Sequence, residues 1–462
     1  MLGVTIGLVV VFFVGRAILK GKYPQLVLFT AGIVMLTCSV AFNLGSFLPA
    51  NAMATGNGYL DIVEFIRYMF SYRLAGLGLI IMVMVGFANY MTYIGANDAF
   101  VNIAIKPMGL IKNPYIMIFV AFVLAKVVSM VITSAAGLGV LCLALLGPPL
   151  IAYGLNPVAI GAVFATSGAA SLVLVGASTM ASAEASAMSI LDYVFIYKLP
   201  AGVPTAIVIG LTHVFWQRYL DKKDGWIVAD HVGDSFKLEV DIERPSTKVP
   251  KVYAILPFLP MVFVVLFSKY GLDGLSLHIA SVMFLSVMIG MFCEVIRHRG
   301  NFDELANGMR VFLQAMGKSL GGIVSLVIAA GVFAEGFKAI GMLDSLVNLA
   351  TMAGIGGVGM SILLVMITSV VAIIAGSNGA SFYPLIEMVP NMAKMLNVPA
   401  VMLVLPMHQA STIARPLSPV AGVVVALAGI LKVSPFELVK RSSVPCIIGL
   451  IAHHFFAFAL SM

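Results

Sequence analysis

Residues 399–428 read PAVMLVLPMHQASTIARPLSPVAGVVVALA, an apolar run of membrane-spanning length that holds an arginine and has proline on both sides of Ser418. An α-helix cannot continue through Pro416 and Pro419 without losing backbone hydrogen bonds. Lipid offers no partner to backbone groups freed at membrane depth, so such a break must face protein or a watery cavity. The stretch therefore predicts a broken membrane-spanning helix with Arg415 at its break.

The whole chain shares this apolar character. Of its 462 residues, 61% are hydrophobic and 10% are charged, and the mean hydropathy is +1.07. Soluble domains carry about 25% charged residues, and a membrane β-barrel would alternate apolar and polar positions instead of forming long apolar runs. We therefore expect an all-α polytopic membrane protein in contact with the lipid bilayer. The net charge of +7 is explained by Lys and Arg in cytoplasmic loops, and no nucleic-acid partner is expected.

The apolar runs predict about ten transmembrane helices plus two re-entrant helical hairpins. Each half of the chain has three spans, a hairpin, a broken helix and a last span, and a charged linker joins the halves. The predicted limits are 1–217 for the first half, with hairpin 114–153 and broken helix 157–187; 218–251 for the cytoplasmic linker; and 252–462 for the second half, with hairpin 357–395 and broken helix 399–428.

The spacing of polar breaks indicates that the two halves are related. Ser134 and Pro157 are 23 residues apart (157 − 134), and Ser377 and Pro399 are 22 apart (399 − 377). A repeat of this order is typical of transporters built from two inverted halves, in which substrate binds where the broken helices meet. We therefore predict an internal duplication.

Loop charges predict the orientation. Five full spans per half is an odd number, so the second half must be inverted relative to the first. With the loop 16–22 inside, most other Lys and Arg also fall inside, while Lys198 and Lys269 are placed in outside loops. Both termini are then predicted to lie on the periplasmic or external side.

Arg415 is the sharpest candidate for a binding residue. A cation within an apolar span costs about 3 kcal/mol on insertion scales, so it requires a counter-charge or a cavity. A guanidinium can hold the carboxylate of an anionic substrate through two parallel hydrogen bonds. Two alternatives stay open: a structural ion pair with a distant carboxylate such as Glu184 or Glu335, or a side chain that reaches the cytoplasmic face.

Other candidates lie at the helix breaks and the hairpin tips. Helix N-termini present free N–H groups and partial positive charge, and nearby hydroxyl and amide groups can donate to a carboxylate. No P-loop, zinc spacing or nucleophile elbow is present, so we expect no enzyme, no cofactor and no metal. The substrate-binding candidates are Arg415, Ser377, Asn378, Gly379, Ser411, Thr412, Ser418, Thr133, Ser134, Ser178 and Thr179, and those for coupling are Lys126, Glu184 and His408.

Several stretches resemble the DcuC family of anaerobic C4-dicarboxylate carriers. The resemblance implies a secondary transporter of the ion transporter superfamily in the inner membrane of a bacterium, which makes the predicted side of both termini the periplasm. It also implies that the transporter moves succinate, fumarate or malate by exchange or efflux, with an elevator motion. Arg415, Ser418 and Pro419 match the family's Arg-x-Leu-Ser-Pro pattern, whereas the first break departs from it, with Ala177-Ser178-Thr179 where the family has an acidic residue. The matching stretches are Tyr93–Asp98 (YIGAND), Phe215–Lys223 (FWQRYLDKK), Tyr253–Pro257 (YAILP), Leu417–Val425 (LSPVAGVVV) and Ser434–Arg441 (SPFELVKR).

Two other functions remain open from the sequence. A carrier for another small organic anion, such as gluconate or citrate, would use the same kind of site. A channel would instead require a continuous polar stripe along several helices, and the polar breaks here concentrate at one depth. The sequence also leaves a homodimer open.

Overall fold

The computed structural model describes residues 2–49, 52–104, 113–132, 134–233, 249–272, 275, 277–352, 354 and 356–461. Within these ranges, nine helices are long and apolar enough to cross a membrane. The prediction of an all-α polytopic membrane protein is thereby confirmed. The count of ten spans and the re-entrant character of the hairpins stay predictions.

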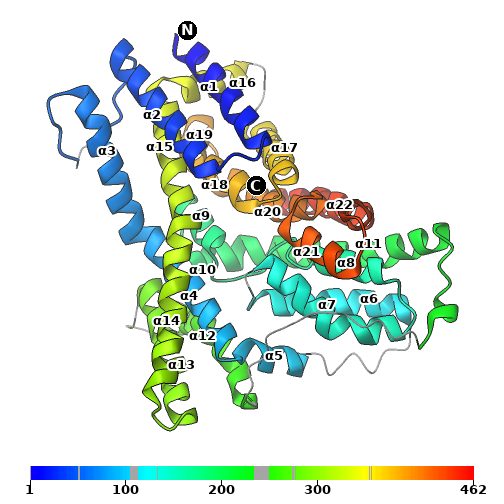
Figure 1. Ribbon diagram of the computed structural model, residues 1–462. Helices are drawn as coiled ribbons and strands as arrows, with labels where there is room; N and C mark the ends of the chain where they lie inside the picture. Colours follow the sequence, from blue (N-terminus) through cyan, green and yellow to red (C-terminus); the bar gives the residue numbers. More distant parts are fainter. Residues whose placement is uncertain are drawn as a thin grey trace.

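Each half of the chain folds into a series of helices that the breaks interrupt (Figure 1). In the first half these are α1 (Leu2–Leu19), α2 (Pro24–Phe42), α3 (Gly58–Arg73), η1 (Leu74–Gly78), α4 (Leu79–Tyr93), α5 (Ala96–Ala104), α6 (Pro114–Ser129), α7 (Ala135–Ala152), α8 (Pro157–Ala165), α9 (Ala177–Ala185), α10 (Ile190–Asp192), η3 (Tyr193–Lys198) and α11 (Leu199–Lys223). A short 3-10 turn, η4 (Val228–His231), follows in the linker, and residues 234–248 of the linker lie outside the described ranges.

The second half follows the same order. Its helices are η5 (Lys251–Phe258), α12 (Leu259–Leu266), α13 (Ile279–Arg297), α14 (Phe302–Ser319), η6 (Leu320–Val324), α15 (Ser325–Ala339), α16 (Met342–Met352), α17 (Gly357–Ala375), α18 (Asn378–Ile386), α19 (Val389–Leu396), α20 (Ala400–Ala414), η7 (Arg415–Leu417), α21 (Gly422–Leu431) and α22 (Pro435–Ser461).

Helices from both halves combine into two groups (Figure 1). In the first group, α2, α3 and α4 pack with α13, α14 and α15, and α15 lies along α2. In the second group, the helices from α6 to α11 pack with those from α17 to α22, and α11 lies against α22. Neither half therefore folds apart from the other.

The contacts between halves occur in reciprocal pairs. Helix α2 packs on α15, and α13 packs on α4; α7 packs on α21, and α18 packs on α9. The π-helical turns η1 and η6, each in the middle of a long helix, contact each other. Reciprocal contacts of this kind are expected from an inverted duplication, and the division into repeats stays a prediction.

The third span of each half is longer than the apolar pattern predicts. The apolar runs cover 74–93 and 311–338, whereas the helical segments cover Gly58–Tyr93, with a kink at Gly76, and Phe302–Ala339. The added turns carry charges such as Asp61 and Arg67 on an amphipathic helix, which hydropathy alone does not count as a span.

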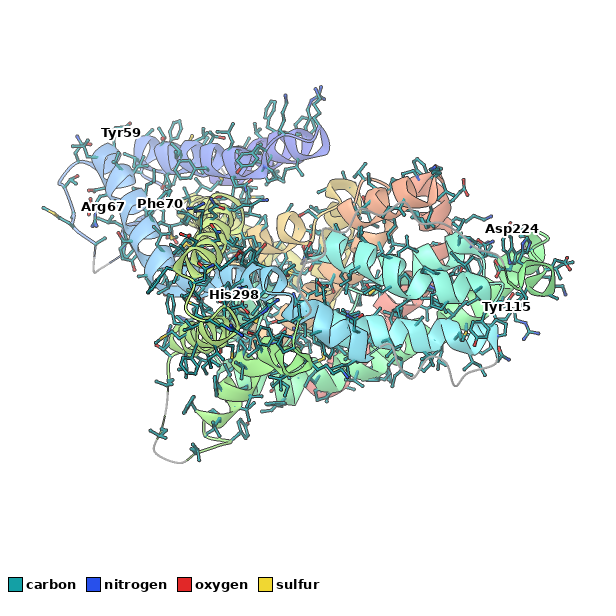
Figure 2. The ribbon with its side chains drawn as sticks, turned by 60° about the horizontal axis from the view of Figure 1, so that its bottom comes forward. Tyr59, Arg67, Phe70, Tyr115, Asp224 and His298 are labelled. Atoms are coloured by element: carbon teal, nitrogen blue, oxygen red, sulfur yellow. The ribbon has the colours of Figure 1, made fainter. Side chains whose placement is uncertain are left out.

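A buried charge network fixes one end of the second group. Arg441 of α22 donates to Asp221 at 2.8 Å and to Asp224 at 3.1 Å, and the hydroxyl of Tyr115 on α6 lies 3.3 Å from Asp221. Figure 2 shows Tyr115 and Asp224 together at this end. Because the Arg441 side chain is 5% exposed, breaking this network would leave a buried charge uncompensated.

Candidate substrate-binding site

A cavity of about 460 Å³ lies between the two groups of helices. The first group contributes mostly apolar side chains, among them Met84, Phe87 and Met283. The second group contributes the polar ones, which come from four separate elements. The predicted residues on its wall are Ser178, Thr179, Ser377, Asn378, Gly379, Thr412 and Arg415.

Arg415 enters this cavity at the end of α20, where the helix tightens into η7. In the described part of the chain no carboxylate lies within ion-pair distance of its guanidinium, and its buried Nε has no hydrogen-bond partner. Glu184 instead pairs with Arg73 at 2.9 Å, and Glu335 pairs with Lys338 at 2.9 Å. The two structural ion pairs considered from the sequence are therefore wrong.

Gly168 makes room for the guanidinium. A Cβ atom at this position would lie 2.9 Å from Nη2 of Arg415. This distance is shorter than side-chain carbon atoms normally allow, so a larger residue would displace Arg415 from its position. Gly168 was missed from the sequence because a single glycine in an apolar chain carries no signal of its partner.

The tip between α17 and α18 approaches the cavity next to the second break, which we define as residues 415–421. Gly376 has a φ of 63°, and a Cβ there would lie 2.9 Å from the backbone of Ala421. Both the left-handed conformation and the close approach require glycine. Ser377 then caps α18 by accepting a hydrogen bond from the Ala380 amide at 3.3 Å. The N-terminus of α18, with Asn378, consequently lies on the cavity wall.

The first break, defined as residues 166–176, separates α8 from α9. The residue before α9 is Gly176, which has no side chain to accept hydrogen bonds from the first turn. The first-turn N–H groups of α9 are therefore available to an anion. The Ser178 hydroxyl lies 2.9 Å from Nε2 of His408, and His408 also contacts the Tyr193 hydroxyl at 3.0 Å. His408 is thus a buried partner of a cavity residue.

Three buried side chains from different elements bind the carbonyl groups of the first break. They come from α6, η3 and α20, and two of them are lysines. Lys126 Nζ donates to Ser167 O at 2.8 Å and to Ala169 O, Gln409 Nε2 donates to Ser171 O at 3.0 Å, and Lys198 Nζ donates to Val173 O at 2.6 Å and to the Thr179 hydroxyl at 2.6 Å.

The burial of Lys198 corrects the sequence prediction. Charge counting placed it in an outside loop, whereas its side chain is 0% exposed within the helix that runs over Ile190–Lys223. The charge pattern places Lys198 outside because it lies near the N-terminal edge of an apolar run. No spacing rule connects it to Val173, because that contact depends on how η3 packs against the first break.

Other predicted residues lie off the cavity. Ser411 donates to the His408 carbonyl at 2.6 Å within its own helix, and Ser418 accepts from the Val420 amide at 3.3 Å in the second break. Ser134 caps α7 by accepting from the Gly137 amide at 3.3 Å. Thr133 lies outside the described residues.

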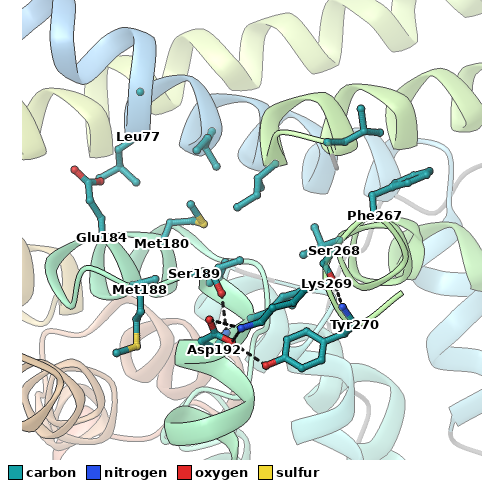
Figure 3. Close-up of a pocket in the computed structure, with 18 of the residues that line it drawn as sticks. Leu77, Met180, Glu184, Met188, Ser189, Asp192, Phe267, Ser268, Lys269 and Tyr270 are labelled. Atoms are coloured by element: carbon teal, nitrogen blue, oxygen red, sulfur yellow. Dashed lines mark hydrogen bonds and ion pairs between the residues drawn. The ribbon is translucent and has the colours of Figure 1, made fainter. Parts of the chain in front are cut away.

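A larger cavity, of about 710 Å³, is a poorer site for an anion (Figure 3). Its charged groups already have partners: Asp192 accepts hydrogen bonds from Lys269 at 3.0 Å and from the Tyr270 hydroxyl at 2.8 Å. The Asp192 carboxylate raises the pKa of Lys269, which keeps this pair charged. Glu184 on the same wall is paired with Arg73, which also lines this cavity. The smaller cavity therefore has the better chemistry.

The fold and the smaller cavity together define a membrane carrier of the broken-helix type. The protein belongs to the DcuC family, whose model, described as C4-dicarboxylate anaerobic carrier, matches residues 2–461. The chain is 38% identical to the anaerobic C4-dicarboxylate transporter DcuC of Escherichia coli strain K12 over 446 residues, 96% of this chain and 94% of the relative. It is 39% identical to a probable transporter of the same name from Vibrio cholerae over 451 residues, 98% and 96% of the two chains.

A solved structure shares the fold. The YdaH transporter of Alcanivorax borkumensis, whose crystal structure has an unusual topology, matches with a TM-score of 0.65 at 14% identity, covering 95% of this chain and 98% of that one. The resemblance to the family that the sequence motifs carried is thereby confirmed, as is the expectation that the chain is a transporter and not an enzyme.

Proposed function

We propose that the protein carries four-carbon dicarboxylates, such as succinate, fumarate and malate, across the bacterial inner membrane by exchange or efflux. The observation that supports this most is Arg415, a cation on the cavity wall without a carboxylate partner in the described residues. Burying such a cation without a counter-charge is costly, and an anionic substrate would offset that cost. The family relatives named above are C4-dicarboxylate transporters, which agrees with this substrate class.

The cavity offers a separate group to each end of such a molecule. Arg415 binds one carboxylate through its guanidinium. The N-terminal turns of α9 and α18 bind the other, with Ser178 and Asn378 as side-chain donors and the first free N–H groups of each helix. Two short helix N-termini together with a guanidinium suit a dianion better than a neutral molecule or a monoanion.

The division of the cavity wall supports an elevator motion. Almost all polar groups of the cavity belong to the second group of helices, whereas the first group presents Met84, Phe87 and Met283. Gln25, a polar residue on the first group's side, donates to the Gly322 carbonyl at 2.9 Å. In our proposal the second group moves with its substrate along this apolar surface, and the linker 218–251 accommodates the motion.

The test is counterflow in liposomes. The purified protein is reconstituted into vesicles loaded with unlabelled succinate, and uptake of labelled succinate and fumarate is measured in parallel with vesicles loaded with gluconate or citrate. Exchange with succinate alone supports the proposal. Uptake driven by gluconate or citrate but not by succinate would replace the substrate class, and no counterflow with any of them would overturn carrier function.

The Arg415→Lys variant tests the site in the same vesicles. It keeps a positive charge but loses the planar pair of donors, so we expect a raised KM for succinate. A variant that retains full affinity would exclude Arg415 as the carboxylate ligand. The matched control is Arg299→Lys, because Arg299 is exposed beyond the end of α13.

A further inference from the structure

Two buried lysines point their ammonium groups at the first break instead of at a carboxylate. The side chains of Lys126 and Lys198 are 4% and 0% exposed. In the described residues neither forms an ion pair, and their hydrogen-bond partners are oxygen atoms of the backbone and of one hydroxyl group. Lys126 Nζ also lies 5.6 Å from the centroid of the Phe122 ring. Burying an ammonium group without a counter-charge is costly, so the two charges require an explanation.

The oxygen atoms around each ammonium group are those that a small metal cation would take. Lys126 Nζ contacts the carbonyl oxygens of Ser167 and Ala169, and Lys198 Nζ contacts the Val173 carbonyl and the Thr179 hydroxyl. In transporters with broken helices, carbonyl groups of unwound backbone coordinate the coupling Na⁺. Here the ammonium groups of the two lysines already bind carbonyl oxygens of this kind.

A neutral side chain binds another carbonyl group of the same break, at Ser171. Gln409 Nε2 donates to the Ser171 carbonyl at 3.0 Å and is also 0% exposed. An uncharged side chain is therefore sufficient to pair a carbonyl group in this segment. What lysine adds at the neighbouring carbonyl groups is positive charge, and Lys198 brings that charge to Thr179 in the first turn of α9.

We propose that Lys126 and Lys198 are tethered cations that take the place of a coupling metal ion at the first break. With them in position, the first break presents a positive field to a dianion, and substrate binds without Na⁺. This inference rests on the proposed transport of dicarboxylates, and it adds that the transport cycle does not require an alkali cation.

The first test needs no variant. Succinate counterflow is measured in vesicles with Na⁺, K⁺ or choline as the sole cation on both sides, at equal ionic strength. We expect equal rates in the three buffers. An exchange rate at least tenfold lower in choline than in Na⁺, which corresponds to about 1.4 kcal/mol, would overturn the tethered-cation proposal. The proposed function would remain intact. No exchange in any buffer would overturn the proposed function instead.

The second test removes one tethered cation. In Lys126→Ala the freed carbonyl groups of Ser167 and Ala169 can take a small cation from solution, so we expect slow exchange in choline and faster exchange in Na⁺ or methylammonium. If the folded variant exchanges equally slowly with every cation, Lys126 has only a structural role and the proposal fails. If its exchange rate in choline equals that of the wild type, Lys126 has no role in transport. The control is Lys394→Ala, on the exposed face of α19.

Discussion

The two breaks differ in how they obtain positive charge. The second break, 415–421, is short and contains its own cation, Arg415, whose guanidinium lies on the cavity wall. The first break, 166–176, contains no charged residue and borrows its charge from Lys126 on α6 and Lys198 in η3. In our proposal, one half of the site contacts substrate through a side chain, while the other half binds it through backbone whose positive charge comes from elsewhere in the chain.

The largest effect is expected at the second break. Arg415→Met removes the group that we assign to direct contact with a carboxylate. Two charge-assisted hydrogen bonds are lost, and each is worth about 1.5–3 kcal/mol, so succinate affinity should fall roughly 100-fold or more. Isothermal titration of the purified protein measures the change, with Arg299→Met as the exposed control. An unchanged Kd would exclude direct contact.

A smaller effect is expected when the first break loses a borrowed charge. Lys198→Met should weaken succinate binding on the order of tenfold, because the lost charge acts through the field and not through a shared hydrogen bond. The melting temperature should not fall steeply, because the desolvation cost of the buried charge is removed together with its two hydrogen bonds, and the Val173 carbonyl still accepts from the Thr179 hydroxyl. Lys394→Met is the control, and a loss as large as that of Arg415→Met would erase the distinction between the two breaks.

The two breaks also meet at Gly168. In Gly168→Ala the new Cβ would lie 2.9 Å from Nη2 of Arg415, so the guanidinium must shift, and we expect a several-fold weaker affinity with near-normal folding. Gly429→Ala on α21 is the matched control, because no neighbouring atom lies within 4 Å of its new Cβ. Equal Kd values for the two variants would show that the position of Arg415 is not critical.

The smallest effect concerns the backbone of the first break. Ala170 has a φ of 49°, a left-handed conformation that costs a non-glycine residue about 1 kcal/mol. Ala170→Gly should therefore raise thermal stability slightly and leave affinity unchanged. Ala162→Gly, within helix α8, should lower stability by about 1 kcal/mol. Melting curves in detergent compare the pair, and a loss of stability in both variants would mean that the strain at Ala170 is negligible.

Much of the candidate site could be predicted from one scarce property of the sequence. Charged residues are rare in this chain, so Arg415 inside an apolar run between prolines identified the second break without any knowledge of packing. The hairpin tip at Ser377 and Asn378 followed from its helix-breaking residues, and both residues lie on the cavity wall. Ser411 and Ser418 belonged to the same pattern, yet a local pattern does not determine which side of a helix faces the cavity.

By itself the sequence determined the all-helical membrane class and the places where helices break, because apolar length and proline act on each segment independently of its neighbours. Only the tertiary structure decided which cations serve the first break. Lys198 is 25 residues from Val173 along the chain, and the packing of η3 brings them together. A buried charge takes partners that the folded chain supplies, and the contact between an ammonium group and a distant carbonyl leaves no periodicity in the sequence.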